Sequence, residues 1–533
     1  MREKPPTGID DSLLKLAGSA GLDGALAAFP GDVLAAASGA AQHRASAVAG
    51  TSAVEVESAG TPNQGTARGE GPTETHWLGA AAIASAFANR QLSPVELLAS
   101  LLDRIARLDP QINAFIHLDA EFAMEAARLA EREISAGRSR GSLHGVPVGI
   151  KDIFDVAGLP TTCNSKIRLG TIASADAHVV ARLRAAGAII LGKLGTHEFA
   201  MGGPAFDLPF PPPRNPWNLD HHPGGSSSGS GAGLAAGLFP LALGSDSGGS
   251  VRHPSSACGI SGLKPTYGLV SRAGVFPLSF TLDTVGPMAR SAADVALMLD
   301  VIAGYDPRDP GSVASPQYGF ASDLQTGVRG LRIGFVRHFH ETDLSADPEV
   351  VAGLEQLAKV LTAEGAQVRT VRLPSLNEFA GVGRVIVSAE GWALHAPWLR
   401  SRPGDYGRLS RQRLMTGAFL MAGDYLQARA RQRQMIDVVN EVFCDVDILL
   451  TASALVPPCR IDDPDMLAHT HGLQAWMPFN VTGHPAITVR TGLSKDGLPL
   501  SAQLVGPLFH DSQVLRAAAA YERSTTFVQR PPM

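Results

Sequence analysis

The residues best suited to chemistry lie in a stretch rich in glycine and serine, from Pro223 to Gly268. Two Gly-Ser runs, at 224–230 and 244–250, lie directly beside apolar segments. Flexible linkers are usually polar throughout and lack such apolar neighbours. Such runs can point many backbone N–H groups and hydroxyls at one place, which is the composition of a nest for an anion or oxyanion. We therefore predict a functional site here rather than a flexible surface loop.

A lysine ends an apolar run upstream of this stretch, in the segment 146–152 (VPVGIKD). If Lys151 lies in a dry pocket, its charged form loses hydration, its pKa falls, and the neutral amine can act as a base. The alternative is a lysine that reaches outward to solvent or pairs with Asp152. Taken alone, the segment favours this alternative.

Three other motif matches in the same stretch are weak. Residues 225–229 fit the G-x-S-x-G elbow with Ser227 as nucleophile, but the preceding segment is a poor strand. Residues 261–264 fit S-x-x-K, although Pro265 argues against the helix that this motif requires. Residues 231–236 fit a dinucleotide-binding loop only loosely, so we predict no cofactor.

Histidine and cysteine give no sign of a metal site. The pairs His221–His222 and His338–His340 lack an accompanying HExxH motif or acidic cluster, so we predict no metal. The four cysteines are Cys163, Cys258, Cys444 and Cys459, and none forms a CxxC motif. So few, unpaired cysteines indicate a reducing compartment, and we expect a cytoplasmic protein.

Short apolar runs alternate with helical patterns along most of the chain. Strands are expected at 146–151, 188–193, 240–246, 331–336 and 367–373. Helices are expected at 93–109, at 174–187, after Gly225 and from Asp347. This alternation predicts an α/β fold with a mixed, largely buried sheet.

The N-terminal part differs in composition from the rest. Residues 10–48 carry Ala, Leu and Val at helical spacing, whereas 50–75 are rich in Gly, Ser, Thr and Pro. We predict a helical N-terminal extension at 1–49, a flexible linker at 50–75 and one large domain at 76–533. The extension could dock on its own domain or on a second protomer, which would give a homodimer.

Composition narrows the classes of partner. The 533 residues are 45% hydrophobic and 18% charged, which excludes disorder for most of the chain. The net charge of -5 provides no basic field and argues against a nucleic-acid partner. We find no uninterrupted apolar run of the length that a membrane span needs, so we expect no membrane association.

Lys151 and the Gly-Ser stretch together resemble the amidase signature family, and the resemblance covers about residues 78–525. The motifs are G-I-K-D at 149–152, P-G-G-S-S-S-G-S at 223–230 and G-S-D-S-G-G-S-V-R at 244–252. The resemblance implies a catalytic triad of Lys151, cis-Ser226 and the nucleophile Ser250. It also implies one α/β domain with a central twisted mixed sheet covered by helices on both faces, plus the short helical extension.

The resemblance further implies the parts of the site that surround the triad. Oxyanion donors would be the backbone N–H groups of Ser247, Gly248, Gly249 and Ser250. Substrate would contact Gly225, Ser227, Met201, Gly202 and Cys163. Arg252 is expected to brace the loop by hydrogen bonds, and the segments 205–213 and 392–434 are candidate pocket walls. In the second segment the apolar lining would come from Met415, Phe419, Leu420, Met421 and Tyr425 if they face the site, although such residues at helical spacing are more often core.

The activity implied is hydrolysis of a C–N bond in a small amide, with an aryl or hydrophobic acyl group, or in a carbamate. Neutral Lys151 would act as base through Ser226, and Ser250 would carry the acyl group. The expected partners are this small amide and water, with no nucleic acid and no membrane. The alternatives are the catalytic subunit of a glutamyl/aspartyl-tRNA amidotransferase-like complex, a carbamate (urethane) hydrolase, and a silent binding scaffold.

Overall fold

One mixed sheet runs through the computed structural model, which describes residues 11–48, 75–315, 319–525, 527 and 529–533. Its strands are β1 (Phe115–Leu118), β2 (Pro147–Lys151), β3 (Ile189–Leu194), β4 (Leu241–Asp246), β5 (Ser261–Lys264), β6 (Thr284–Ala289), β7 (Arg332–Phe335), β8 (Gln367–Thr370), β9 (Ile448–Ala452), β10 (Ala486–Leu493) and β11 (Pro499–Val505). Within the described ranges the strand order is β1-β3-β2-β4-β6-β5-β10-β11-β9-β7-β8.

The helices surround this sheet. They are α1 (Asp11–Ser19), α2 (Asp23–Ala28), α3 (Pro30–Val48), α4 (Ala80–Ala88), α5 (Pro94–Ile112), α6 (Ala120–Ser135), α7 (His178–Ala185), α8 (Ser228–Ala235), α9 (Arg252–Cys258), α10 (Ala292–Ile302), α11 (His338–Glu341), α12 (Pro348–Ala363), α13 (Leu376–Ser401), α14 (Arg408–Met415), α15 (Ala422–Asp445), α16 (Pro464–Gly472), α17 (Met477–Val481) and α18 (Asp511–Ser524). Short 3-10 turns are η1 (Thr75–Trp77), η2 (Glu198–Ala200), η3 (Leu324–Thr326), η4 (Pro403–Asp405) and η5 (Thr416–Phe419).

The sheet combines parallel and antiparallel pairs. Strand β2 pairs in parallel with β3 and β4, and β7 does so with β8 and β9, while β10 pairs antiparallel with β5 and β11. Every residue of β2, β4, β9 and β11 is buried. Near-continuous apolar strands of this kind need cover on both faces.

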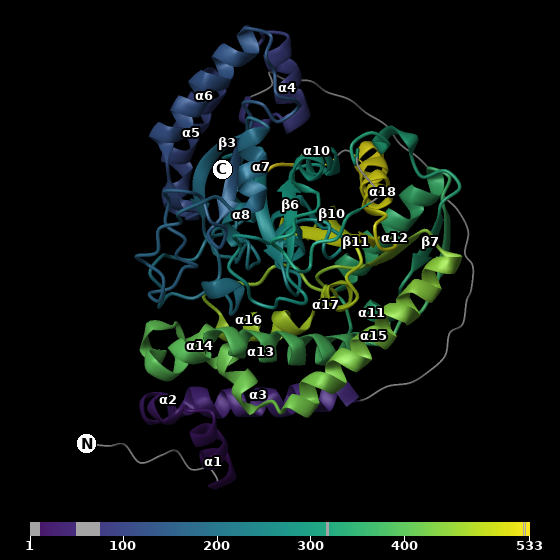
Figure 1. Ribbon diagram of the computed structural model, residues 1–533. Coiled ribbons are helices and arrows are strands. Elements are labelled where there is room, and N and C mark those ends of the chain that lie inside the picture. Colours follow the sequence, from purple (N-terminus) through teal and green to yellow (C-terminus); the bar gives the residue numbers. More distant parts are fainter. Residues whose placement is uncertain (1–10, 49–74, 316–318, 526, 528) are drawn as a thin grey trace.

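Two groups of helices supply that cover (Figure 1). Helices α8 and α9 pack on each other and on strands of the sheet, and α10 and α12 each pack on α18 and on the sheet. The predicted α/β fold, with one large sheet flanked by helices, is confirmed.

Local signals in the sequence place several helix starts. Ser93 caps α5: its hydroxyl accepts from the Glu96 N–H at 3.2 Å, and the Glu96 carboxylate accepts from the Ser93 N–H at 2.9 Å. Asp347 accepts from the Glu349 N–H at the start of α12, with Pro348 in its first turn. Each cap satisfies an N–H group that has no partner within its helix.

The N-terminal helices dock on the chain's own later helices. Helix α3 lies along α13 and also contacts α14 and η5 (Figure 1). Asp32 of α3 forms an ion pair with Arg411, in which the Arg411 Nε to Asp32 Oδ2 distance is 2.7 Å and both side chains are nearly buried. Arg44 donates to the Phe419 carbonyl at 2.7 Å. Most of the predicted linker at 50–75 falls outside the described residues, so the domain division stays a prediction.

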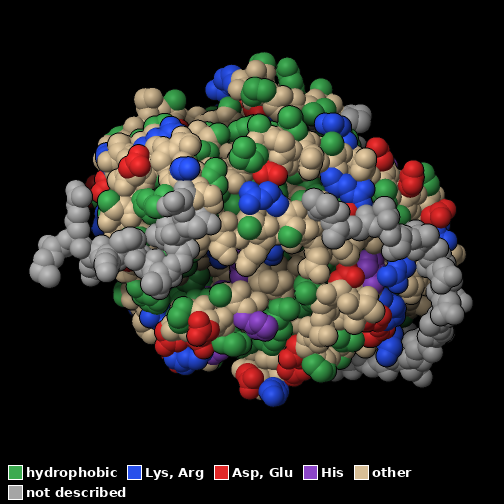
Figure 2. All heavy atoms as spheres, turned by 90° about the horizontal axis from the view of Figure 1, so that it is seen from below, with side chains coloured by type: hydrophobic (Ala, Val, Ile, Leu, Met, Phe, Trp, Pro, Cys, Tyr) green, Lys and Arg blue, Asp and Glu red, His purple; other side chains and the backbone are tan. Residues whose placement is uncertain are grey.

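The surface over these helices mixes both signs of charge. In Figure 2, Lys and Arg side chains lie among Asp and Glu side chains, and the surface is hollowed near the middle with histidine beside the hollow. In the described ranges, no helix combines the length and apolar character needed to cross a membrane.

Candidate active site

The end of strand β2 and two loops place the three residues of the predicted triad beside one another. Lys151 is the last residue of β2, and Ser250 follows β4 by four residues. Because β2 and β4 are parallel neighbours, their carboxyl ends meet at the same edge of the sheet. Ser226 lies in the loop that leads into α8, and the Ser227 N–H donates to the Ser250 carbonyl at 3.1 Å.

Lys151 points at hydroxyl groups rather than at a carboxylate. Its Nζ lies 2.7 Å from Ser226 Oγ and 2.8 Å from Ser245 Oγ, and the side chain is fully buried. The neighbouring Asp152 pairs instead with Lys193, 2.7 Å away. The interpretation of Lys151 as a partner of Asp152 is therefore wrong.

This environment changes the proton affinity of Lys151. Burial lowers the pKa of its ammonium from 10.5 to about 7, against an opposing effect of the Asp246 and Asp283 carboxylates. Desolvation disfavours the charged form because the amine has exchanged water for two neutral hydroxyls and a dry interior. A substantial fraction of this amine is therefore neutral at neutral pH.

Glycine is required where the two serine loops approach their neighbours. The Gly225–Ser226 peptide bond is cis, and a Cβ on Gly225 would collide with the His197 ring. Gly249 adopts a φ of +118°, and a Cβ there would lie 2.8 Å from Trp476 Cβ. These contacts explain why glycine occupies these two positions, since any larger residue would displace one of the loops.

The loop that carries Ser250 is held by a buried ion pair. Arg252 Nε lies 3.0 Å from Asp246 Oδ2, and both side chains are fully buried. The Arg252 guanidinium also donates to the Trp476 carbonyl at 3.0 Å and to Gln503 at 3.0 Å. The prediction that Arg252 braces this loop is confirmed.

The Asp246 carboxylate also holds this loop in place through hydrogen bonds to its backbone. Burial alone would raise the pKa of Asp246, but Arg252 and a hydrogen bond from Asn480 outweigh it and hold that pKa well below its usual range. The carboxylate accepts from the Gly249 N–H at 2.7 Å. That N–H is engaged and cannot also serve a substrate oxygen, so the structure favours Ser247, Gly248 and Ser250 among the four predicted oxyanion donors.

Neutralising Asp246 is expected to destabilise the fold strongly. Asp246→Asn leaves the buried Arg252 guanidinium without its counter-charge, which costs about 3–5 kcal/mol. Urea unfolding monitored by circular dichroism measures the change. Asp220→Asn is the matched control, because Asp220 pairs with Arg460 on the surface at 3.2 Å, where we expect no measurable effect. Equal stability of the Asp246 variant and the wild type would contradict this assignment.

A large cavity opens onto the serine loops. It has a volume of about 730 Å³, and its wall includes Ser226 and Ser250. Of the residues expected to bind substrate, Gly225, Met201 and Gly202 line this cavity. Ser227 and Cys163 are buried beside it and do not form its wall. All of these roles stay predictions.

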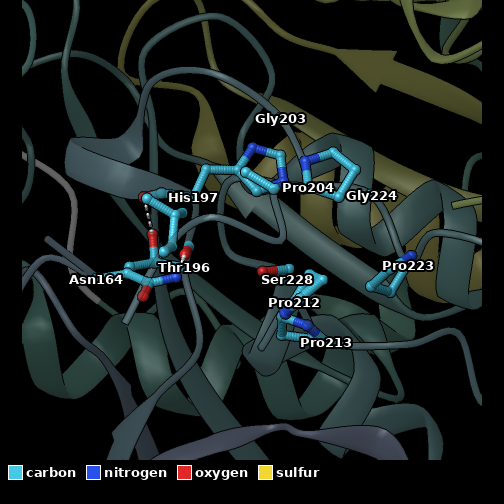
Figure 3. Close-up of a pocket in the computed structure, with 12 residues that line it drawn as sticks. Asn164, Thr196, His197, Gly203, Pro204, Pro212, Pro213, Pro223, Gly224 and Ser228 are labelled. Carbon is cyan, nitrogen blue, oxygen red and sulfur yellow. Dashed lines mark hydrogen bonds between the residues drawn. The ribbon is translucent and has the colours of Figure 1, made fainter. Parts of the chain in front are cut away.

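A small side pocket adjoins the large cavity (Figure 3). Asn164, Thr196 and Ser228 line it together with four prolines, Pro204, Pro212, Pro213 and Pro223. The Asn164 side-chain amide donates to the Thr196 carbonyl at 3.0 Å. The two hollows share His197, Gly203 and Pro204. The candidate wall segment 205–213 borders both, because Phe206 lines the large cavity and Ala205, Leu208, Pro212 and Pro213 line the side pocket.

The sequence missed several residues that face the cavity. Ser245 supplies the second hydroxyl that contacts Lys151; it lies inside the motif at 244–252, but the motif alone did not assign it a role. Helix α3 lines the cavity with Ala35, Gly39 and His43, which recur every four residues on one face. Arg384 of α13 and Arg413 of α14 also face it. By contrast, the apolar residues considered as lining do not: Met415 and Phe419 are core residues, Met421 is exposed, and Leu420 and Tyr425 are partly buried against the core.

The weaker motifs have structural explanations. Residues 261–264 form strand β5 rather than the helix that S-x-x-K needs, and residues 231–236 lie in and just after α8. Between residue 195 and Ser227, all of which the structure describes, no strand is formed. The described part of the chain also holds no group of three or more His, Cys, Asp or Glu placed to bind a metal.

Comparison with known proteins identifies relatives over most of the chain. A model of the amidase family matches residues 96–515. One glutamyl-tRNA(Gln) amidotransferase subunit, from Chloroflexus aggregans, is 38% identical over 86% of this chain and 99% of the relative. A solved structure described as revealing the evolutionary origins of an s-triazine catabolic enzyme is 33% identical, with a TM-score of 0.80, over 86% of this chain and 100% of that one. A bacterial aryl acylamidase of the amidase signature family is 28% identical, with a TM-score of 0.78, over 85% and 97%.

These relatives correct one prediction from the sequence. We expected a small amide and water as the only partners, with no nucleic acid, because the net charge of -5 provides no basic field. Relatives named as subunits of a glutamyl-tRNA(Gln) amidotransferase overturn that expectation. Net charge averages over the whole surface, so it does not exclude membership of a complex that acts on tRNA.

Proposed function

Because the chain belongs to the amidase signature family, we propose that it cleaves the C–N bond of an amide through an acyl-enzyme on Ser250. The observation that carries this proposal is the position of Lys151, fully buried and within 2.7 and 2.8 Å of two serine hydroxyls. A lysine in this setting is partly neutral, and a neutral amine can accept a proton.

The proposed reaction proceeds in two halves. Ser250 Oγ attacks the amide carbon, its proton passes to Ser226, and the Ser226 proton passes to Lys151. The C–N bond then breaks, and the leaving nitrogen receives the proton back through the same relay. Water attacks the resulting ester by the same route and releases the acid. The N–H groups of Ser247, Gly248 and Ser250 would stabilise the oxyanion in both halves.

We propose that this chemistry serves an amidotransferase complex, as in the amidotransferase relatives named above. An amidotransferase moves nitrogen from a donor amide to an acyl acceptor, so one of its parts must cleave the donor amide. The relatives align over 95–99% of their own length, which favours the same role for this chain.

A second candidate is a hydrolase of small amides or carbamates that acts alone. The observation that favours it is the docking of α3 on the cavity, because the family match begins at residue 96 and does not include this helix. The resemblance to an aryl acylamidase agrees with this candidate. For either candidate we propose a cytoplasmic location, since all four cysteines are free.

One experiment separates the two candidates. Ammonia release by the purified full chain is measured with glutamine, simple primary amides and carbamates, and Ser250→Ala serves as the inactive control. In parallel, the chain is mixed with the other subunits of the Chloroflexus aggregans amidotransferase, with glutamine as nitrogen donor and ATP to activate the acceptor carboxylate, and amidation of glutamyl-tRNA(Gln) is measured.

The amidotransferase role predicts ammonia release from a donor amide and amidation of the glutamyl-tRNA(Gln) in the mixture. Cleavage of small amides or carbamates without any transfer would support the second candidate instead. If the wild-type chain cleaves no amide and no carbamate, the proposed hydrolysis is wrong.

A further inference from the structure

A second cavity meets the large one at the loop that carries Ser250. It has a volume of about 220 Å³, and its wall shares Ala200, Ser247 and Leu278 with the large cavity. Of the two cavities, only the large one has Ser226 and Ser250 in its wall. The second cavity therefore reaches the predicted oxyanion loop at Ser247 without reaching the nucleophile.

Asp283 lines this second cavity and holds Ser247. Strands β4 and β6 pair antiparallel, and their register sets Asp283 across from Ser247, one step beyond the last pair. The Ser247 hydroxyl donates to Asp283 Oδ1 at 2.5 Å, while the Leu278 and Ser279 N–H groups donate to Oδ2 at 2.8 and 3.0 Å. One carboxylate thus joins the loop of Ser250 to the segment before β6.

This carboxylate forms no ion pair within the described part of the chain. Arg272, whose field reaches it, is paired with Asp309, 2.7 Å away. Burial raises the pKa of Asp283 to about 6, although the hydrogen bond from Ser247 and those from the backbone oppose the rise. Asp283 is therefore mostly ionised at pH 7. A secluded charge without an ion pair costs free energy, and such groups gather at functional sites.

We propose that Asp283 is a positioning residue for hydrolysis at Ser250: it holds Ser247 so that the oxyanion loop keeps its reactive shape. The inference rests on the proposed function, since it concerns the same reaction. Oxyanion donors must point at the developing charge before the reaction begins, and the Ser247 N–H is one of the three donors that the structure favours. Asp283 acts on this N–H through the Ser247 side chain, from the second cavity.

The charge of Asp283 also reaches Lys151. Burial lowers the pKa of Lys151 to about 7, while Asp246 and Asp283 oppose that fall. The other titratable groups that face Lys151 are Cys163 and His197. Both are neutral at pH 7, because burial raises the pKa of the thiol and lowers that of the imidazole well below its usual range. Without the charge of Asp283, the pKa of Lys151 should fall further and the lysine should become a weaker base.

Asp283→Asn removes the charge at nearly constant size. We expect kcat on a cleaved amide to fall at least about tenfold, with KM little changed, because the substrate binds in the large cavity. The fall of kcat/KM at acidic pH should move to lower pH, since Lys151 loses a neighbouring negative charge. Steady-state kinetics over the pH range measures both effects.

Asp294→Asn is the matched control. Asp294 also accepts from a serine hydroxyl, that of Ser291 at 2.9 Å, and from a backbone N–H, that of Ala81 at 3.1 Å. It lies in the wall of neither cavity. This variant should keep the kcat and the pH profile of the wild type.

Two further variants separate positioning from a simple loss of stability. Ser247→Ala breaks the same contact from its other side, so it should lower kcat by a similar factor, and the double variant should lose little more. Asp283→Ala leaves room in the second cavity for formate. Added formate should raise the kcat of this variant about tenfold, whereas chloride at equal concentration should not.

The rate at which a fluorophosphonate labels Ser250 gives a readout that needs no amide. If the wild type is labelled but cleaves no amide, the proposed function fails, and slower labelling of Asp283→Asn still supports the positioning role. Unchanged kcat, pH profile and labelling rate in Asp283→Asn would overturn that role while leaving hydrolysis at Ser250 intact. A loss that formate does not relieve and that Ser247→Ala does not share would overturn it as well, because Asp283 would then act only on stability.

Discussion

Ser250→Ala is expected to lower kcat on any amide substrate by at least about 10⁴-fold. The residue follows β4, faces the cavity, and lies in a loop fixed by Asp246 and Arg252. Without its hydroxyl no acyl-enzyme can form, and water would have to attack the amide directly. Steady-state kinetics measures the loss, and circular dichroism checks that the variant is folded.

A matched serine keeps this result specific. Ser255 lies on α9, five residues after Ser250, and its hydroxyl donates to the Val251 carbonyl at 2.8 Å. Ser255→Ala should retain activity and should still react with a fluorophosphonate, whereas Ser250→Ala should not. Full labelling of the Ser250 variant would show that another residue is the nucleophile.

Lys151→Met should also remove amidase activity, with a smaller effect on activated esters. An amide nitrogen leaves only when protonated, so the relay through Lys151 matters twice, while a good ester leaving group needs less help. Lys166→Met is the control, because Lys166 is exposed. Equal losses on amides and activated esters would argue that Lys151 only holds the loops in place.

The same lysine sets the expected pH profile. Burial lowers its pKa from 10.5 to about 7, and the base must be neutral to accept a proton. Below pH 7 the amine is protonated, so kcat/KM should fall about tenfold per pH unit, and above pH 7 it should level off. With an unperturbed pKa the rise would continue to about pH 10. A profile still rising at pH 9 would contradict neutral Lys151 as the base.

The candidate triad could be named from sequence because three short, contiguous motifs together resemble those of one family. Ser226 and Ser250 sit in Gly-Ser runs whose backbone must approach other groups closely, and Lys151 ends a buried strand. The alternation of apolar runs and helical patterns likewise predicted the α/β sheet. Residues adjacent in the chain form these motifs and patterns, so they can be recognised in the sequence without the fold.

The walls of the cavity could not be predicted in this way. Arg384 and Arg413 lie on helices whose patterns look like ordinary surface or core, and only packing shows that they share a cavity with Ser250. The apolar residues Met415 and Phe419 were plausible pocket lining, but their side chains pack in the hydrophobic core instead. Likewise, composition shows that α3 is helical, but not which surface it covers.

The acyl-enzyme provides the most direct test of the account. The wild-type chain is mixed with a slowly hydrolysed amide or activated ester, quenched in acid, and analysed by intact-protein and peptide mass spectrometry. The account predicts a mass increase equal to the acyl group, located on Ser250 and absent from Ser250→Ala. Turnover with the acyl group on a different residue, or an unchanged adduct in Ser250→Ala, would contradict it.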